Sequence, residues 1–348
     1  MKQRRKKKPY LFFITPGFIA YTIFIILPIL YVIYLSVFEW SGLGEMKLVG
    51  MENFKTLFTN TRIAPVFFNA LKNNLKYLLC VWFIITPFQF LVAYLFYLKI
   101  PFFKYYKFMI FMPYVISSTI VSFFATMVFN PTIGFLNTFF EKLGLDGLVS
   151  AWVGDPKLSF KIMIALVLWQ GAASGMMIFY ANMMDIPSDI IEASKIDGCS
   201  EAQRLFRILI PLSLPACSSI IVMSSIWALG VFDIPFMLGG PTGGVNSSLD
   251  FVNLVFYRYT FGSVLSGEVN LGFGASISVT MFFIIMIVPL SRIRCLPNLN
   301  TIPKEDIWQR KEKTKKSYPA LPAWCAGYFP YYCFYSQASP YLSCFPPF

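Results

Sequence analysis

The feature that most constrains this chain is a series of long apolar segments with almost no charge. The first, residues 10–38, contains no Lys, Arg, Asp or Glu. About 20 apolar residues in an α-helix cross the hydrocarbon core of a bilayer. The whole chain of 348 residues is 57% hydrophobic and only 13% charged, whereas a soluble domain carries about 25% charged residues. The sequence therefore predicts an all-α membrane protein.

Polar or turn-rich connections divide the apolar sequence into six segments. We expect transmembrane helices over residues 10–38, 71–97, 105–129, 160–184, 212–237 and 270–290. Residues 39–70, 130–159 and 238–269 form the connections on one side of the membrane, the second with a short amphipathic helix over 136–143. Gly171 and Gly175 have the small-xxx-small spacing that lets another helix approach closely.

The distribution of basic residues predicts the orientation. The formal net charge is +12, and Lys and Arg concentrate at the two ends of the chain and in the short connections. By the positive-inside rule, both termini then lie in the cytoplasm, with residues 1–9 as a basic N-terminal segment. The first apolar segment is too long for a signal peptide and lacks a cleavage site, so we expect it to stay. A basic excess at the ends does not form a nucleic-acid groove, so we expect membrane lipid and no nucleic acid.

The C-terminal tail, residues 294–348, differs from the permease-like body at 10–293. From Tyr318 onwards it has no charged residue and is rich in proline and aromatic residues. Proline at this density excludes another helix, and we expect disorder. We hypothesise that a reading-frame change produced this tail, which resequencing the coding DNA would test.

Several kinds of chemistry are excluded by missing residues. The sequence has no histidine, which removes His-based triads and the HExxH metal site. No GxxxxGK[ST] motif is present, so the chain does not hold nucleotide phosphates in a P-loop. The seven cysteines form no CxxC pair and are expected to be free thiols. We therefore expect a protein that is not an enzyme, with no metal or cofactor in this chain.

A charged interval, residues 185–215, interrupts the apolar sequence between the fourth and fifth spans. Acidic and basic residues alternate along it, and charged side chains are costly in lipid, so the interval lies in water or against a partner. Asp189-x-x-Glu192 and Ser200-x-x-Gln203 each have the capping-box spacing, Gly198 separates them, and Pro211 ends the segment. Two short helices joined at a glycine are predicted, with an apolar edge on the first at Ile190, Ala193 and Ile196.

Residues 192–211, EASKIDGCSEAQRLFRILIP, resemble the EAA signature of binding-protein-dependent ABC importer permeases. The matching positions are Glu192, Ala193, Ile196, Asp197, Gly198, Ile208 and Pro211. Ser194, Cys199, Leu205 and Ile210 depart from the usual pattern without removing a charge or the glycine. GMENF, NPTIGFLN, WVGDP, FDIPFMLGGP and GFGASIS resemble the carbohydrate branch, which includes the larger maltose permease subunit and the glycerol-phosphate and multiple-sugar permeases. The resemblance covers residues 10–290, although Pro289 is unusual so late in the sixth span.

The resemblance implies a transport subunit in the bacterial cytoplasmic membrane. Residues 185–211, called the coupling loop below, would seat two coupling helices in a cytoplasmic ATPase dimer that binds ATP and Mg. The coupling residues would be Glu192, Ala193, Ser194, Asp197, Gly198 and Pro211. The other implied partners are a second permease subunit, giving a heterodimer, and an extracytoplasmic solute-binding protein that delivers a carbohydrate, most simply an oligosaccharide. Another polar solute such as glycerol-phosphate is the alternative.

Residues for substrate contact are predicted from their chemistry, because sugars bind to aromatic faces and hydrogen-bonding side chains. The candidates in or near the spans are Gln89, Trp169, Gln170, Tyr180, Asn182, Trp227 and Asp233. Packing and interface anchoring are the alternative for each aromatic residue. A secondary transporter is the competing class, and Asp233 is the one candidate for its ion site. A membrane-embedded enzyme would need a catalytic cluster that the sequence lacks.

Overall fold

The computed structural model describes residues 10–262 and 269–295, and side chains between residues 13 and 287 of those ranges. The described chain is mostly α-helix. Its one small sheet among these residues pairs β1 (Phe38–Glu39) with β2 (Lys47–Leu48) in antiparallel fashion, with Phe38 opposite Leu48. The predicted all-α membrane class is confirmed.

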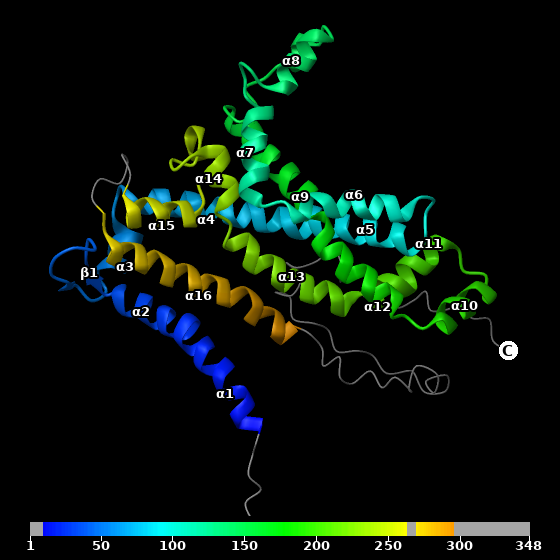
Figure 1. Ribbon diagram of the computed structural model, residues 1–348, viewed down its shortest axis with the longest axis horizontal. Helices are drawn as coiled ribbons and strands as arrows, with labels where there is room; N and C mark the ends of the chain where they lie inside the picture. The colour runs from blue at the N-terminus through cyan, green and yellow to red at the C-terminus, as the bar shows by residue number, and fades with distance from the viewer. Residues whose placement is uncertain (1–9, 263–268, 296–348) are drawn as a thin grey trace, which may run out of the picture.

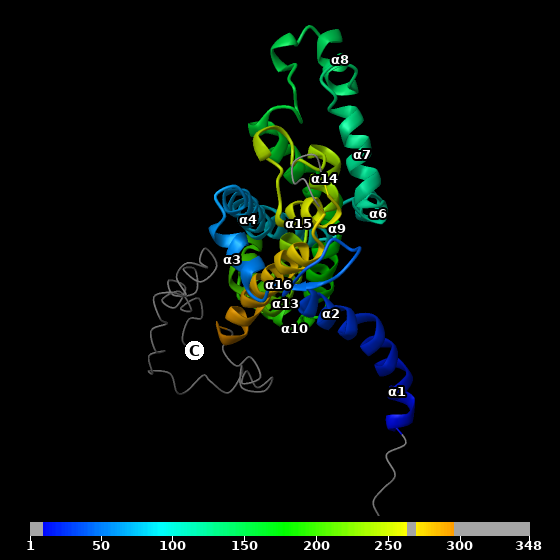
Figure 2. The same cartoon turned by 90° about the vertical axis from the view of Figure 1, so that its left-hand side faces the viewer.

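The first apolar segment forms α1 (Tyr10–Tyr21), η1 (Thr22–Ile26) and α2 (Leu27–Leu35). The helix ends at Leu35, slightly before the predicted residue 38. Only α2 packs against the rest of the protein, through α16 (Leu271–Cys295), and most side chains of the segment are exposed. Figures 1 and 2 show α1 leading away from the bundle. A long exposed apolar helix is stable in lipid or against a second protein.

The second apolar segment is one long helix, made of α4 (Ile63–Cys80), η2 (Val81–Ile85) and α5 (Thr86–Tyr97). It follows a short helix, α3 (Glu52–Thr59), and begins at Ile63 rather than at the predicted residue 71. Asn60 Oδ1 accepts hydrogen bonds from the Arg62 and Ile63 amides and so starts the helix. The prediction was late because asparagines in the first turns read as a polar connection.

Three five-residue π-helical turns precede prolines. η1, η2 and η4 (Leu205–Leu209) each end two residues before a proline, at Pro28, Pro87 and Pro211. Proline has no amide hydrogen and its ring clashes with the carbonyl four residues earlier. Widening the preceding turn relieves that clash, and Thr86 adds a side-chain hydrogen bond of 3.0 Å to the Val81 carbonyl.

The third predicted span is not one continuous helix. α6 (Phe103–Val115) and α7 (Ser118–Val128) meet at an angle of 95°. Pro113 weakens the last turn of α6, and Ile116 has an extended backbone. Hydropathy could not reveal this bend, because both halves are apolar. α7 and the predicted amphipathic helix, now α8 (Phe135–Lys142), project away from the bundle (Figure 1).

The fourth apolar segment forms α9 (Pro156–Met184), which the Asp155 side chain begins by accepting from the Lys157 amide. α9 packs closely along α5. Gln89 Nε2 donates to the Gly171 carbonyl at 2.8 Å, and a Cβ on Gly175 would lie 2.0 Å from Gln89 Oε1. The predicted close approach of another helix at these glycines is confirmed.

The rest of the chain contains more breaks than predicted. Its elements are α10 (Ser188–Ile196), α11 (Glu201–Arg204), η4, α12 (Ile210–Leu212), α13 (Leu214–Leu229), α14 (Asp233–Gly239), η3 (Asp146–Leu148) in an earlier connection, η5 (Val245–Ser247), α15 (Val252–Phe261) and α16. The fifth span is interrupted after Leu229, and the predicted last connection contains α15. α16 continues past Pro289, so that proline does not end the helix.

Four helices of the described chain are long and apolar enough to cross a membrane, or five if the bent α6–α7 pair counts as one span. The four are Phe13–Leu35, Ile63–Tyr97, Pro156–Met184 and Leu214–Gly239, and the apolar part of α16 over Leu271–Ile287 is shorter. A multi-pass membrane protein is established. The expected basic N-terminus at 1–9 and nearly all of the expected tail lie outside the described residues.

Two groups of buried side chains hold the bundle together. One joins α4, α13, α15 and α16, with Phe67, Phe251 and Ile277 fully buried. The other joins α5 and α9 to the coupling loop, with Phe179 and Leu209 at its centre. The coupling loop and α15 occupy opposite ends of the molecule (Figure 1), so each apolar group supports one end.

Candidate functional site

The coupling loop begins with α10, whose start differs from the prediction. Pro187 occupies the N-cap position, and no side chain caps the helix. The predicted capping box of Asp189 and Glu192 is therefore wrong, because Asp189 lies inside the first turn instead of before it. A carboxylate in the first turn still interacts favourably with the positive end of the helix.

Gly198 ends α10 in a left-handed conformation, with φ of +75°. The Cys199 amide donates to the Ser194 carbonyl at 3.0 Å, and the Gly198 amide donates to the Lys195 carbonyl at 3.1 Å. This pair of bonds is the Schellman motif. No atom lies within 4 Å of where a Cβ on Gly198 would be, so backbone conformation alone requires glycine here. The predicted turn at Gly198 is confirmed.

The second short helix starts with the predicted capping box. The Gln203 amide donates to Ser200 Oγ at 3.3 Å, and the Ser200 amide donates to Gln203 Oε1 at 2.8 Å. Two amides that would otherwise lack partners are satisfied reciprocally. α11 then continues through η4 and α12 to Pro211 and α13.

Apolar contacts fix the coupling loop to the membrane helices. Leu209 is buried among Phe179 and Met183 of α9, with Ile191 and Leu205 packed beside them. Ser194 is also buried, and its hydroxyl donates to the Ile191 carbonyl at 2.7 Å. A displacement of the loop is therefore transmitted to α5 and α9 through close-packed side chains.

The outer face of α10 has a different character. Glu192, Lys195 and Asp197 are exposed, and within the described part of the chain none of the three forms an ion pair. Ile196, at 87% exposure, extends beyond the apolar edge predicted for this helix and contacts little else. Only Arg204 and Glu201, on α11, pair within the loop. Exposed charges around a bare isoleucine form a surface for protein contact.

The predicted substrate residues lie in separate places, and no hydrogen bond joins any two of them in the described ranges. Gln89 is buried in the α5–α9 contact. Lys107 Nζ lies 5.2 Å from the centre of the Tyr180 ring, a cation–π contact. Asn182 lines a shallow cavity of about 530 Å³ between α9 and α13, and its Oδ1 has no hydrogen-bond partner among the described residues. Trp169 and Trp227 are 54% and 77% exposed.

Gln170 and Asp233 both contact the bend between α6 and α7. Gln170 Nε2 donates to the Ile116 carbonyl at 2.8 Å, and Ser118 Oγ donates to Asp233 Oδ2 at 2.8 Å. Each bond supplies a partner to a residue beside the break. Irregular backbone at membrane depth is tolerated where protein covers it or where it lines a water-filled cavity. These two candidates therefore share one polar region.

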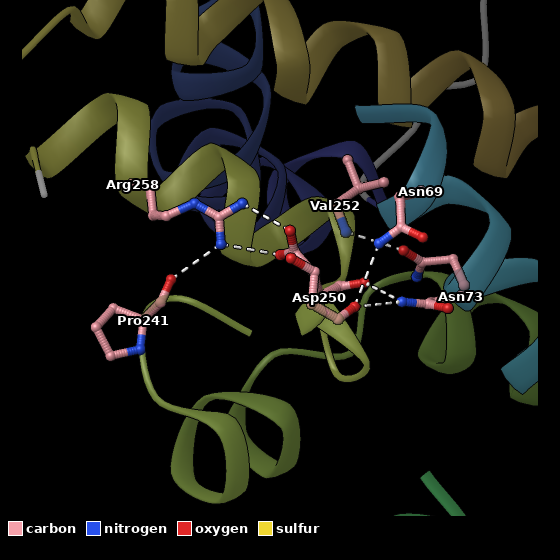
Figure 3. Close-up of polar contacts among 8 residues, drawn as sticks. Asn69, Asn73, Pro241, Asp250, Val252 and Arg258 are labelled. Atoms are coloured by element: carbon pink, nitrogen blue, oxygen red, sulfur yellow. Dashed lines mark hydrogen bonds and ion pairs between the residues drawn. The ribbon is translucent and has the colours of Figure 1, made fainter. Parts of the chain in front are cut away.

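The sequence reasoning missed a buried polar network at the opposite end (Figure 3). Asp250 and Arg258 form a bidentate ion pair of 2.8 and 2.9 Å, and their side chains are 1% and 4% exposed. Burial raises the pKa of Asp250, and the Arg258 guanidinium opposes that shift. Asn74 Oδ1 accepts from the Val252 amide at 3.0 Å. The signal in the sequence was an isolated acid and base eight positions apart beside apolar residues.

A bundle of long apolar helices with an exposed, structured loop defines a multi-pass membrane subunit that works through a partner. Residues 85–294 match the family of the binding-protein-dependent transport system inner membrane component. The chain belongs to this family.

Curated relatives cover nearly the whole body of the chain. A probable ABC transporter permease, YurN of Bacillus subtilis, is 28% identical over 301 residues, which cover 84% of this chain and 97% of the relative. The multiple sugar-binding transport system permease MsmF of Streptococcus mutans is 29% identical over 287 residues, covering 81% and 93%. The crystal structure of a bacterial alginate ABC transporter with an alginate pentasaccharide-bound periplasmic protein contains a chain with a TM-score of 0.69 and 20% identity, over 81% of this chain and 92% of that one. That likeness concerns the fold.

Proposed function

We propose that this chain is a permease subunit of an ATP-driven importer that takes up a carbohydrate, most simply an oligosaccharide. The observation that carries the proposal is the coupling loop, a structured pair of helices fixed to α5 and α9 but exposing unpaired charges outward. The substrate class rests on similarity to relatives named for sugars: multiple sugars, arabinooligosaccharides and lactose. A relative named for osmoprotective compounds keeps another polar solute as the alternative.

In this proposal, the coupling residues have separate tasks. Glu192 and Asp197 supply negative charge to a basic site on an ATPase subunit, and Ala193 and Ser194 allow close packing of α10 on the body. Gly198 makes the turn, and Pro211 ends the segment with the widened turn of η4. ATP and Mg bind to the partner ATPase dimer. Closure of that dimer shifts the loop and selects one of two conformations of α5 and α9.

The same proposal includes the topology and the other partners. α16 and the bent α6–α7 pair complete six spans, both termini lie in the cytoplasm with the coupling loop, and a second permease subunit packs beside this one. An extracytoplasmic solute-binding protein delivers the carbohydrate at the end near α15. Exposed apolar side chains along α1 and α2 support an extensive contact with lipid or the second permease.

The proposed substrate path runs along the polar region at the α6–α7 bend. Gln170 and Asp233 lie there, and the exposed rings of Trp169 and Trp227 offer faces for a sugar. Tyr180 and Asn182 continue the path toward the coupling loop, and Gln89 supports it from the α5–α9 contact. Trp227→Ala with unchanged expression should reduce uptake, and wild-type uptake would remove Trp227 from the path.

The decisive test of the proposed function uses proteoliposomes that contain both permeases and the ATPase, with the binding protein and labelled sugar added. Glu192→Lys should abolish uptake, because it places a cation against the basic ATPase site. Vanadate should also abolish uptake by the wild type. Glu141→Lys, an equal charge reversal on exposed α8, is the matched control and should transport normally. Uptake driven by an ion gradient and insensitive to both treatments would instead identify a secondary transporter.

A further inference from the structure

The loop between α14 and α15, residues 239–250, is held by side chains from two other elements (Figure 3). Arg258 of α15 reaches back to both carboxylate oxygens of Asp250 and also donates to the Pro241 carbonyl at 2.9 Å. It therefore fastens the two ends of the loop to each other. We call residues 239–250 the Gly-rich loop.

α4 fastens the middle of the Gly-rich loop. Asn69 and Asn73 both donate to the Ser247 carbonyl, at 3.2 and 3.1 Å, and Asn73 also donates to the Asp250 carbonyl at 2.9 Å. These asparagines lie one turn apart on one face of α4. Carbonyl groups that a simple surface loop would leave to water are thus bonded to the helical body.

The backbone of the Gly-rich loop is compact and strained. Asn246 and Ser247 have φ of +53° and +52°, where residues with a Cβ are disfavoured. A Cβ on Gly243 would lie 2.6 Å from the Asp250 Cβ. The Leu249 amide donates to the Gly243 carbonyl at 2.8 Å, across the base of the loop. Surroundings that hold a strained conformation this firmly leave the loop one shape.

The ion pair contributes more to shape than to stability. Removing two charges from water costs several kcal/mol per ion, and apolar replacements of buried pairs are often neutral or stabilising. The geometry imposed by the bidentate pair is the better reason for its presence. The part it holds forward consists of Pro241, Thr242, Val245 and Asn246, all exposed and uncharged.

We propose that Asp250 and Arg258 are positioning residues that present this exposed tip as a docking surface for the extracytoplasmic solute-binding protein. The inference rests on the proposed function, which places this end outside the cell. The tip lies at the end of the molecule opposite the coupling loop (Figures 1 and 2). An uncharged, preformed tip suits recognition by shape, since preorganisation lowers the entropy cost of binding.

The first test measures binding of fluorescent, sugar-loaded binding protein to the complete transporter in nanodiscs. Val245→Asp should weaken this binding about tenfold, because a charge would be desolvated in an apolar contact. Leu48→Asp is the matched control, an exposed apolar residue of β2 changed to the same acid, and its affinity should match the wild type. Wild-type affinity for Val245→Asp would overturn the proposal. So would a changed sugar dependence with unchanged affinity for the binding protein, because the tip would then face the sugar.

The second test separates positioning from stability. Arg258→Lys keeps the charge but loses the two-pronged contact. In nanodiscs, it should raise the binding-protein concentration for half-maximal ATP hydrolysis several-fold, while the rate at saturation stays near wild type. A lower saturated rate with an unchanged half-maximal concentration would show a structural role only. If Glu192→Lys abolishes uptake while both loop variants behave normally, the docking inference fails and the proposed function stands.

Discussion

The two ends of the molecule treat charge in opposite ways. At the α15 end, Asp250 and Arg258 are buried and bonded to each other and to backbone groups. At the coupling-loop end, Glu192 and Asp197 are exposed and have no ion pair among the described residues. Charge satisfied inside a protein fixes its own architecture, whereas structured charge left outside is available to a partner. The difference assigns a shape-holding role to one end and a contact role to the other.

Glycine shows the same contrast. Gly198 and Gly243 both have positive φ, at +75° and +77°. Nothing surrounds the position of a Cβ on Gly198, while on Gly243 it would collide with Asp250. The first glycine only reverses the chain, and the second also permits close approach of two backbone segments. The coupling loop is shaped locally, and the Gly-rich loop is shaped by tertiary contacts.

The largest effect should come from breaking the buried pair. Arg258→Ala leaves a carboxylate buried without its partner and should reduce the free energy of unfolding by about 3–5 kcal/mol. Thermal unfolding of the purified protein in detergent would measure the loss. Lys55→Ala, which breaks an exposed pair of 3.6 Å with Glu52, is the control and should change little. Equal losses in both variants would refute the contrast between buried and exposed charge.

A smaller effect is expected between the ends, where α5 meets α9. Gly175→Ala places a methyl group against the Gln89 side chain and should cost about 1–3 kcal/mol through overpacking. Gly171→Ala is the matched control, because no atom lies within 4 Å of its Cβ position. The same unfolding assay applies. A Gly171 variant as unstable as the Gly175 variant would mean that helix flexibility, not packing, explains both glycines.

The sequence predicted the local features well. The all-helical class, the apolar segments, the turn at Gly198 and the capping box at Ser200 depend on nearby residues, so spacing and hydropathy revealed them. The bend at Ile116, the helix α15 and the Asp250–Arg258 pair depend on contacts between distant segments. For example, Gln170 and Asp233 stabilise the bend from α9 and α14. No pattern within residues 105–129 contains that information.

The next effect concerns the coupling loop itself. Ser200→Ala removes the hydroxyl that accepts from the Gln203 amide and should cost about 1 kcal/mol. Because α11 is short, the change should appear mainly as faster hydrogen exchange at the amides of residues 201–204. Ser188→Ala is a suitable control, since that serine does not cap α10. Unchanged exchange in Ser200→Ala would show that packing of Leu205 and Leu209 alone holds the helix.

The smallest effect on stability should accompany the loss of function. Glu192 is exposed and unpaired within the described chain, so Glu192→Ala should change the free energy of unfolding by no more than about 0.5 kcal/mol. Uptake in proteoliposomes should nevertheless fall strongly, because the carboxylate's proposed partner is the ATPase. Asp189→Ala, in the same helix, controls for loss of an exposed acid. Destabilisation by Glu192→Ala comparable to that of Ser200→Ala would indicate a structural role, and would remove the distinction between a charge that shapes the protein and one that engages a partner.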